Sequence, residues 1–116
     1  MKFLQTLMLA AVPMVALPFS AMAQEYVSIG SCPVTCTAYT WSAGIADVIN
    51  KNVEGVQATA EETKGYIANI ALLQNGELEA SMATSLSAFE AYTATGNYEG
   101  TTAGKVMAWM SIAPVG

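Results

Sequence analysis

From residue 25 onward, short apolar stretches with strand character alternate with longer stretches of helical periodicity. Each strand-like stretch ends in a polar turn, and helical spacing resumes after it. Strands that alternate with helices predict an α/β fold, in which a mainly parallel sheet is flanked by helices and connected by right-handed crossovers. The predicted strands are residues 26–29, 56–60, 78–83 and 105–112, and the predicted helices are residues 41–53, 66–75 and 86–92.

The helical stretches carry the usual signals of amphipathic helices. Asp47 and Lys51 lie four residues apart in the first one and are expected to pair. Gly76 follows Asn75 and predicts the end of the second helix. Phe89 is expected to point inward from the third. The apolar residues that recur on one face of the first helix, and are expected to be buried, are Trp41, Ile45, Val48, Ile49 and Val53.

Residues 1–23 have the features of a secretory signal peptide. Lys2 provides a positive start, residues 3–17 are mostly apolar, and Ala21-Met22-Ala23 fits the small-x-small cleavage rule. The alternative is an uncleaved membrane anchor, against which two prolines and the short apolar run argue. We therefore predict an exported protein that does not span the membrane after cleavage, with one partial domain at residues 24–116 that is large enough for one modest core.

The charge balance argues against nucleic-acid binding. The chain has nine Asp and Glu, four Lys and Arg and no His, for a formal net charge of −5 at pH 7. Binding to nucleic acids needs clusters of Lys and Arg that contact phosphates, and no such cluster is present in the sequence. An acidic surface is expected simply to keep an exported protein soluble.

Cys32 and Cys36 are separated by three residues in the turn after the first predicted strand. In an exported chain a disulfide is the natural hypothesis, and the turn at Pro33 would allow it. Free thiols are the main alternative, and a catalytic or redox role is a remote one because a C-x-x-C motif is absent. A metal site is a poor alternative, because two thiols without His leave a tetrahedral zinc half-coordinated.

Catalysis has little support in the sequence. There is no His to act as a base for a Ser or Thr nucleophile, and no G-x-S-x-G motif. Glu61 and Glu62 could be an acid/base pair, but a solvated turn at a helix start is the simpler interpretation. We predict that the protein is not an enzyme and needs no metal or other cofactor.

Polar, small and hydroxyl residues gather where the predicted strands lead into helices, at residues 31–40, 62–66 and 84–87. In a parallel sheet these three junctions lie at one edge. Backbone N–H groups and hydroxyls at helix N-termini can hold an anionic or polar ligand there. The alternative is that they only cap three helices.

The junctions and the segments between them resemble the solute-binding subunits of TRAP transporters of the TAXI type. That family has an IGTG-like turn followed by a VTGVYYPxGGxIAxxVN-like segment, and residues 28–50 read SIGSCPVTCTAYTWSAGIADVIN. An ESTGGSxxNIxxLxxGELD-like stretch corresponds to residues 60–80, AEETKGYIANIALLQNGELEA. QSD-like and AYxGTG-like segments correspond to residues 83–96, ATSLSAFEAYTATG, and the strand that follows to residues 105–114, KVMAWMSIAP.

The resemblance runs in order over nearly the whole chain after residue 23, with departures at several site positions. Ala38 and Thr40 flank Tyr39 where the family has a second tyrosine and a proline, and Lys64 and Tyr66 replace small residues. The ligand-binding residues that the resemblance implies are Ser31, Thr35, Tyr39, Thr63, Gly65 and Ser85.

The resemblance implies a periplasmic receptor that captures a small organic acid or an amino acid such as glutamate and delivers it to the TRAP membrane subunits. It also implies part of lobe 1 of a type II periplasmic-binding-protein fold, with the second lobe missing from residues 1–116. Two other hypotheses stay open: a truncated or degenerate fragment that acts as an interaction module without ligand binding, and a small exported thiol or disulfide protein.

Overall fold

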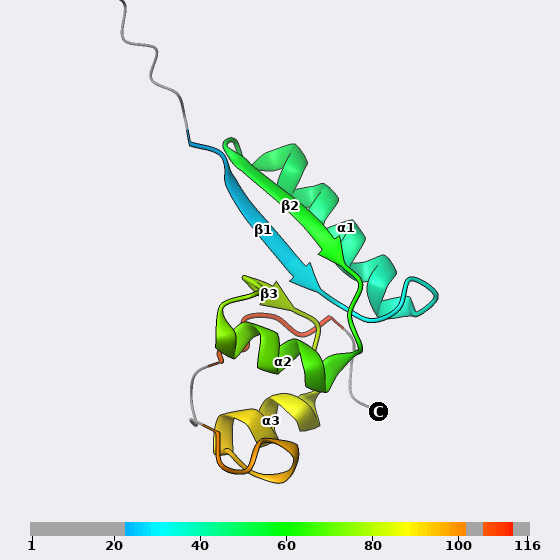
Figure 1. Cartoon of the computed structure of the whole chain (residues 1–116). Coiled ribbons are helices and arrows are strands. Elements are labelled where there is room, and N and C mark those ends of the chain that lie inside the picture. The colour runs from blue at the N-terminus through cyan, green and yellow to red at the C-terminus, as the bar shows by residue number, and fades with distance from the viewer. Residues whose placement is uncertain (1–22, 102–105, 113–116) are drawn as a thin grey trace, which may run out of the picture.

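The computed structural model describes residues 23–101 and 106–112. Three strands alternate with three helices along this part of the chain (Figure 1). The elements are β1 (Glu25–Gly30), α1 (Thr37–Asn52), β2 (Val56–Glu61), α2 (Tyr66–Asn75), β3 (Ala80–Ser81), α3 (Ser85–Thr93) and the 3₁₀ turn η1 (Gly96–Tyr98).

The strands form a parallel sheet in the order β2-β1-β3. β1 pairs with β2 along its full length, from Glu25 opposite Val56 to Gly30 opposite Glu61. Its pairing with β3 is limited to Ile29 opposite Ala80 and Gly30 opposite Ser81. The predicted α/β class with a parallel sheet and flanking helices is confirmed, and it is compatible with part of a periplasmic-binding-type lobe.

Side chains alternate between the two faces of β1, and this alternation separates the layers. Ile29 is buried in a cluster with Ala46 of α1 and Ala58 of β2. The next position, Gly30, faces the other way, because a Cβ there would meet the side chains of Leu78 and Asn69. The helix α1 therefore covers one face of the sheet, and α2 approaches the other.

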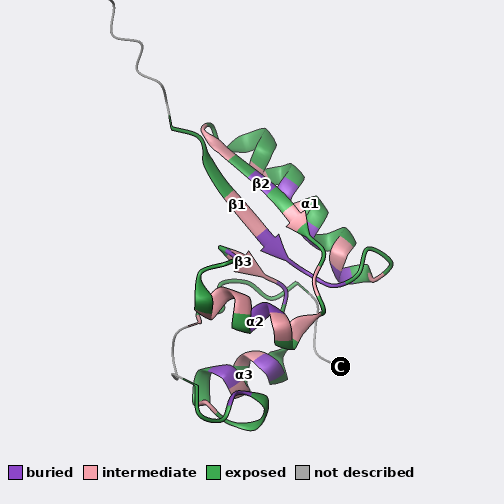
Figure 2. Cartoon of the chain, viewed as in Figure 1, coloured by how far each residue is buried: buried purple, intermediate pink, exposed green. Residues whose placement is uncertain are grey.

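α1 begins earlier than the sequence predicts, and its buried face overlaps the predicted apolar stripe only in part. Ile45 and Ile49 of that stripe are partly buried and pack against the cluster of Ile29, Ala46 and Ala58. The helix starts at Thr37 rather than Trp41, so the predicted loop 31–40 is shorter. Its buried residues are Ala38, Ser42 and Ala46, which let the helix approach the sheet closely. Much of α1 is exposed (Figure 2). Three residues of the predicted buried stripe are substantially exposed, namely Trp41, Val48 and Val53 at 41%, 60% and 47%. The predicted pair of Asp47 and Lys51 is confirmed.

α2 has the predicted bounds, and it ends at Gly76 in the left-handed conformation with φ 75°. Ile70 is its buried apolar residue, and it packs with Ala91 of α3 and Tyr98 of η1. The prediction that Phe89 points inward is wrong, because this side chain is exposed. Smaller residues of α3, Ser87 and Ala91, occupy the buried face instead.

Two predicted strands are shorter or absent. The third, predicted at residues 78–83, is limited to β3 because only two residues reach the backbone of β1. The fourth strand is predicted at residues 105–112, and its described part, residues 106–112, forms neither strand nor helix. The predicted signal peptide falls on residues 1–22, which lie outside the described residues, and on Ala23. Within the part of the chain that the structure describes, no helix is long and apolar enough to cross a membrane.

Candidate functional site

The three strands end at one edge of the sheet, and the loops that leave them meet there. The loop after β1 begins at Ser31, the loop after β2 contains Thr63, and the loop after β3 begins at Met82. Because all three strands are parallel, their carboxyl ends lie together, as the sequence predicts. In open α/β sheets, ligands bind outside this edge.

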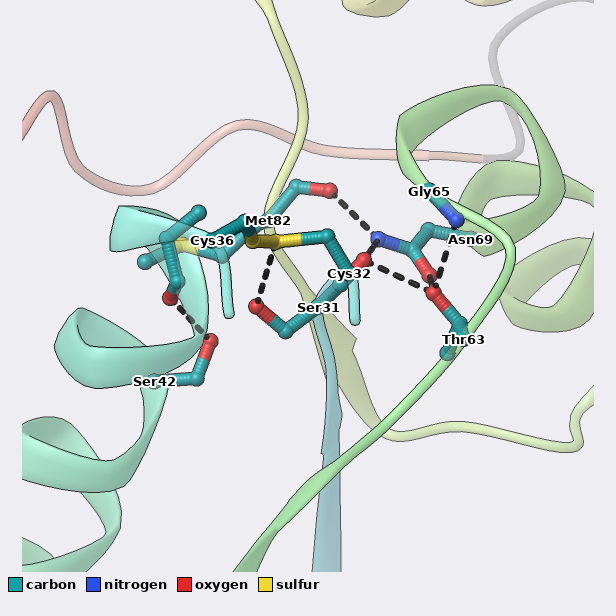
Figure 3. The surroundings of a disulfide bond; sticks show 9 residues. Ser31, Cys32, Cys36, Ser42, Thr63, Gly65, Asn69 and Met82 are labelled. Carbon is teal, nitrogen blue, oxygen red and sulfur yellow. Dashed lines mark hydrogen bonds between the residues drawn. A yellow bond between two sulfur atoms is a disulfide. The ribbon is translucent and has the colours of Figure 1, made fainter. Parts of the chain in front are cut away.

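Asn69, one turn into α2, joins the three loops (Figure 3). Its Nδ2 donates to the carbonyl oxygen of Ser31 at 2.7 Å and to that of Met82 at 2.9 Å. Its Oδ1 lies 2.6 Å from the hydroxyl oxygen of Thr63. The side chain is fully buried. Both amide protons and the amide oxygen are thus used, and the loops after β1, β2 and β3 are held by one residue.

Thr63 adds a second layer to this network. Its Oγ1 lies 2.7 Å from the Ser31 carbonyl oxygen and accepts from the Gly65 N–H at 3.1 Å. The hydroxyl has one proton, which it shares between the Ser31 carbonyl oxygen and the Asn69 Oδ1. Gly65 has φ 107°, a conformation that favours glycine, and it leads directly into α2.

A disulfide joins Cys32 to Cys36 and closes the loop between β1 and α1, with the two Cα atoms 6.3 Å apart. Within this loop, the Cys36 N–H donates to the Pro33 carbonyl oxygen at 2.9 Å. Cys32 is buried in a cluster with Ala38 and Met82. The disulfide therefore fixes the residue that precedes α1, and the packing of Cys32 against Met82 connects the loop to the end of β3.

The N-termini of the three helices differ in how they are capped. Thr84 and Ser87 form a capping box at the start of α3, in which the Ser87 N–H donates to Thr84 Oγ1 at 3.1 Å and the Thr84 N–H donates to Ser87 Oγ at 3.0 Å. The residues before α1 and α2, Cys36 and Gly65, give no side-chain cap. The first N–H groups of α1 and α2 therefore have no capping side chain as acceptor, and the positive end of each helix dipole lies at this edge.

The structure brings some of the predicted site residues together and leaves others apart. Ser31, Thr63 and Gly65 belong to the network around Asn69, where the Ser31 side chain is fully buried. Tyr39 is half-buried against the cluster of Cys32, Ala38 and Met82. Thr35 is exposed in the disulfide loop, and Ser85 is exposed at the first turn of α3. Ligand contact by these six residues stays a prediction.

Asn69 is the residue of this edge that reasoning from the sequence missed. It stands between apolar neighbours in the stretch YIANIALL, where the apolar period draws attention to Ile67 and Ile70. A lone polar residue on an otherwise apolar face, aligned with an NI pair in the family pattern, is the signal that could have identified it.

Two depressions lie near this edge. The smaller, of about 360 Å³, is lined by the β2–α2 loop, including Thr63 and Lys64, and by one side of α2. The larger, of about 870 Å³, extends away from the edge between α1, β1, β3, α2, α3 and residues 106–112. We call this larger depression the apolar groove. Ser85 and Tyr66 lie where it meets the carboxyl edge of the sheet.

Comparison with protein families matches residues 29–114 to the NMT1-like family. The matched segment extends from the end of β1 through all the described elements that follow it. Domains of this family are periplasmic-binding-like, and the family is one of binding proteins rather than enzymes. The parallel sheet with loops gathered at its carboxyl edge and the two helix N-termini without side-chain caps agree with a binding domain of this kind. The match over most of the sequence shows that the chain belongs to the NMT1-like family.

Proposed function

We propose that the protein is the periplasmic receptor of a TRAP-type secondary transporter, and that it captures a small organic acid or an amino acid such as glutamate at the carboxyl edge of its sheet. The observation that carries this proposal is the pair of helix N-termini, of α1 and α2, that have no side-chain cap at this edge. A carboxylate is the kind of group that such N–H groups and dipoles attract. Membership of a solute-binding family supports binding as the role.

The side chains around the two helix starts suit an anionic ligand with a polar body. Lys64 is exposed immediately before α2 and supplies a positive charge. Tyr39 offers an aromatic wall, and Thr35 and Ser85 offer hydroxyls from the loops after β1 and β3. Ser31, Thr63 and Gly65, already hydrogen-bonded in the network, keep the loops in place beneath these groups.

Isothermal titration with a panel of dicarboxylates and amino acids tests ligand capture. We expect saturable binding that weakens with added salt, because exposed charges are screened. Lys64→Gln should weaken binding by about tenfold, equivalent to about 1.4 kcal/mol. The matched control is Lys51→Gln, which removes a lysine that is paired with Asp47 near the end of α1. The absence of heat across the panel, or equal losses in both variants, would contradict ligand capture at this edge.

The transport role needs a separate test. Liposomes with TRAP membrane subunits from the same genome should take up the ligand only when this protein and an ion gradient are both present. Uptake without the protein would contradict the receptor role even if the protein binds ligand.

Export is tested by fractionation and mass spectrometry, which should find the protein in the periplasm with Gln24 as its first residue.

A further inference from the structure

The apolar groove has no charged residue in its lining. It is lined by 25 residues of the described chain, and none of them is Asp, Glu, Lys or Arg. The chain as a whole has 9 acidic residues and a net charge of −5. The groove is therefore an uncharged surface on an acidic protein, and a partner that bound through charge complementarity would find nothing to pair with there.

Large apolar side chains in this groove are exposed to an unusual extent. Trp41, Phe89, Tyr92, Met107 and Trp109 have exposed fractions of 41%, 63%, 63%, 90% and 72%. Four of the five are aromatic, and at about 150–250 Å² for each aromatic side chain these four expose roughly 500 Å², to which the Met107 side chain adds its own surface. A stable interface between two proteins buries about 800 Å² on each partner. The exposed surface is therefore close to what one side of a stable interface requires.

Protruding and recessed parts lie side by side on this face. Met107 and Trp109 project from residues 106–112, which run past β3 and α2 (Figure 1). The recess next to them has a volume of about 870 Å³. A twofold dimer uses the same patch on both subunits, so the patch must contain both the projections and the hollow that receives them.

We propose that the apolar groove is the interface of a homodimer, in which residues 106–112 of each copy pack into the groove of the other. The area, the lack of charge and the presence of projections and a hollow on one face fit a second copy of this chain. The proposed interface adjoins the proposed ligand edge, where Ser85 lines the groove, but the proposal does not depend on ligand binding.

The two tryptophans of the chain provide a direct readout, because both line the groove. The sequence contains 2 tryptophans, Trp41 and Trp109, so no other tryptophan contributes to the fluorescence. The full-length gene product, with any processing by the host, is studied from about 1 to 100 µM, which covers dissociation constants in the micromolar range. With rising concentration we expect a shift of the emission to shorter wavelength, less quenching by acrylamide and a doubling of the mass in light scattering.

Phe89→Glu and Leu86→Glu form a matched pair of variants on α3. The two side chains have nearly equal exposure, 63% and 65%, but only Phe89 lines the groove. Phe89→Glu should raise the dissociation constant of the dimer at least tenfold, and Leu86→Glu should leave it within about twofold. Circular dichroism and thermal unfolding of both variants check that each is folded.

Several outcomes would overturn the dimer. A wild-type protein that stays monomeric at 100 µM, with unshifted tryptophan emission, would show that the groove is not a dimer interface. A series of larger oligomers would contradict a closed twofold contact, and an equal effect of the two substitutions would place any contact elsewhere. If Phe89→Glu does not fold, the concentration dependence of the wild-type fluorescence still decides the question.

Discussion

Asn69 shows how much of this fold depends on a single amide. It is fully buried, and its side chain bonds to the loops that follow all three strands. A buried polar group is costly when it loses its partner, because neither water nor protein then satisfies it. The carboxyl edge is consequently sensitive to substitutions at a position that no ligand needs to touch.

We expect Asn69→Leu to lower the free energy of unfolding by about 2–4 kcal/mol, because the carbonyl oxygens of Ser31 and Met82 would lose a buried donor. Urea unfolding followed by circular dichroism measures the change. The control is Asn75→Ala on the same helix, where an exposed amide contacts Glu77 and the change should stay within about 0.5 kcal/mol. Similar effects of both substitutions would argue against the network as the source of stability.

Two glycines are expected to respond in opposite directions to alanine. A Cβ at Gly30 would overlap the buried Leu78 side chain and lie 3.1 Å from Asn69 Oδ1, so Gly30→Ala should destabilise the protein by about 1–3 kcal/mol. Gly44 lies inside α1 with open space around it, and Gly44→Ala should stabilise by up to about 1 kcal/mol. Thermal unfolding of both variants checks the prediction, and a shift in the same direction for both would refute it.

At the scale of elements, the sequence predicts periodic segments well and contacts between them poorly. The bounds of α2 follow from the apolar period and the Asn75-Gly76 stop, and they are correct. The start of α1 is missed because its packing face is made of Ala38, Ser42 and Ala46, which apolar periodicity ignores. The length of β3 cannot be predicted from its own residues, because it depends on how far its backbone runs beside β1.

For the candidate site too, the sequence predicts the arrangement of the elements but not the contacts between them. Parallel strands place the three junctions at one edge, and this follows from the order of the elements alone. The bonds that join Ser31, Thr63 and Asn69 could not be predicted, because they connect residues up to 38 positions apart that differ in type and loop. Long-range polar contacts of this kind leave no periodic signal in a sequence.

The disulfide is expected to make a modest contribution to stability, because the loop that it closes is short. Loop-closure entropy for such a small ring corresponds to about 2 kcal/mol. Urea unfolding with and without reductant should differ by this amount, and alkylation without reductant should modify neither Cys32 nor Cys36. Complete alkylation of the unreduced protein would show that the bond is absent. Adding reductant to a Cys32→Ser/Cys36→Ser variant is the control and should change nothing.

Ionisation of Tyr98, in the turn η1, is expected to make the stability of the fold depend on pH in the alkaline range. Burial raises the pKa of Tyr98, and the negative charge of Glu90 raises it further. The pKa of Tyr98 is higher in the folded state than in the unfolded chain. The contribution of Tyr98 to the free energy of unfolding is therefore complete below about pH 10, and it is lost as the pH rises through the folded-state pKa.

Tyr98→Phe should therefore reduce the loss of stability between about pH 9 and pH 11. Urea unfolding at several pH values measures this slope. Tyr92→Phe removes an exposed hydroxyl from neighbouring α3 and serves as the control. An alkaline slope that is unchanged in Tyr98→Phe would show that Tyr98 does not contribute to it.

At the scale of the whole molecule, most of the described buried apolar residues fall into three small clusters rather than one core. One lies between β1, β2 and α1, one around Cys32 and Met82, and one between α2, α3 and Tyr98. The last is connected to the sheet mainly by the short pairing of β3 and by the network around Asn69. The parts of the molecule should therefore differ in local stability.

Native-state hydrogen exchange should resolve this difference. Amides of β1 that pair with β2 should exchange slowest, those of α3 faster, and those of residues 106–112, which form neither strand nor helix, fastest. Measurement well below any dimer dissociation constant avoids protection by association. Uniform protection from β1 to residue 112 would contradict separate cooperative units.

The central place of β1 gives the molecule a direction of assembly. Of the three described strands, the one made first on the ribosome lies between the two that are made later, in the order β2-β1-β3. The backbone groups of β1 can complete their hydrogen bonds only after residues 56–61 have been made for one side and residues 80–81 for the other. As the chain emerges N-terminus first, from a ribosome or across a membrane, its sheet therefore stays incomplete for most of this time. Chaperones that hold extended segments have their longest opportunity to bind at β1.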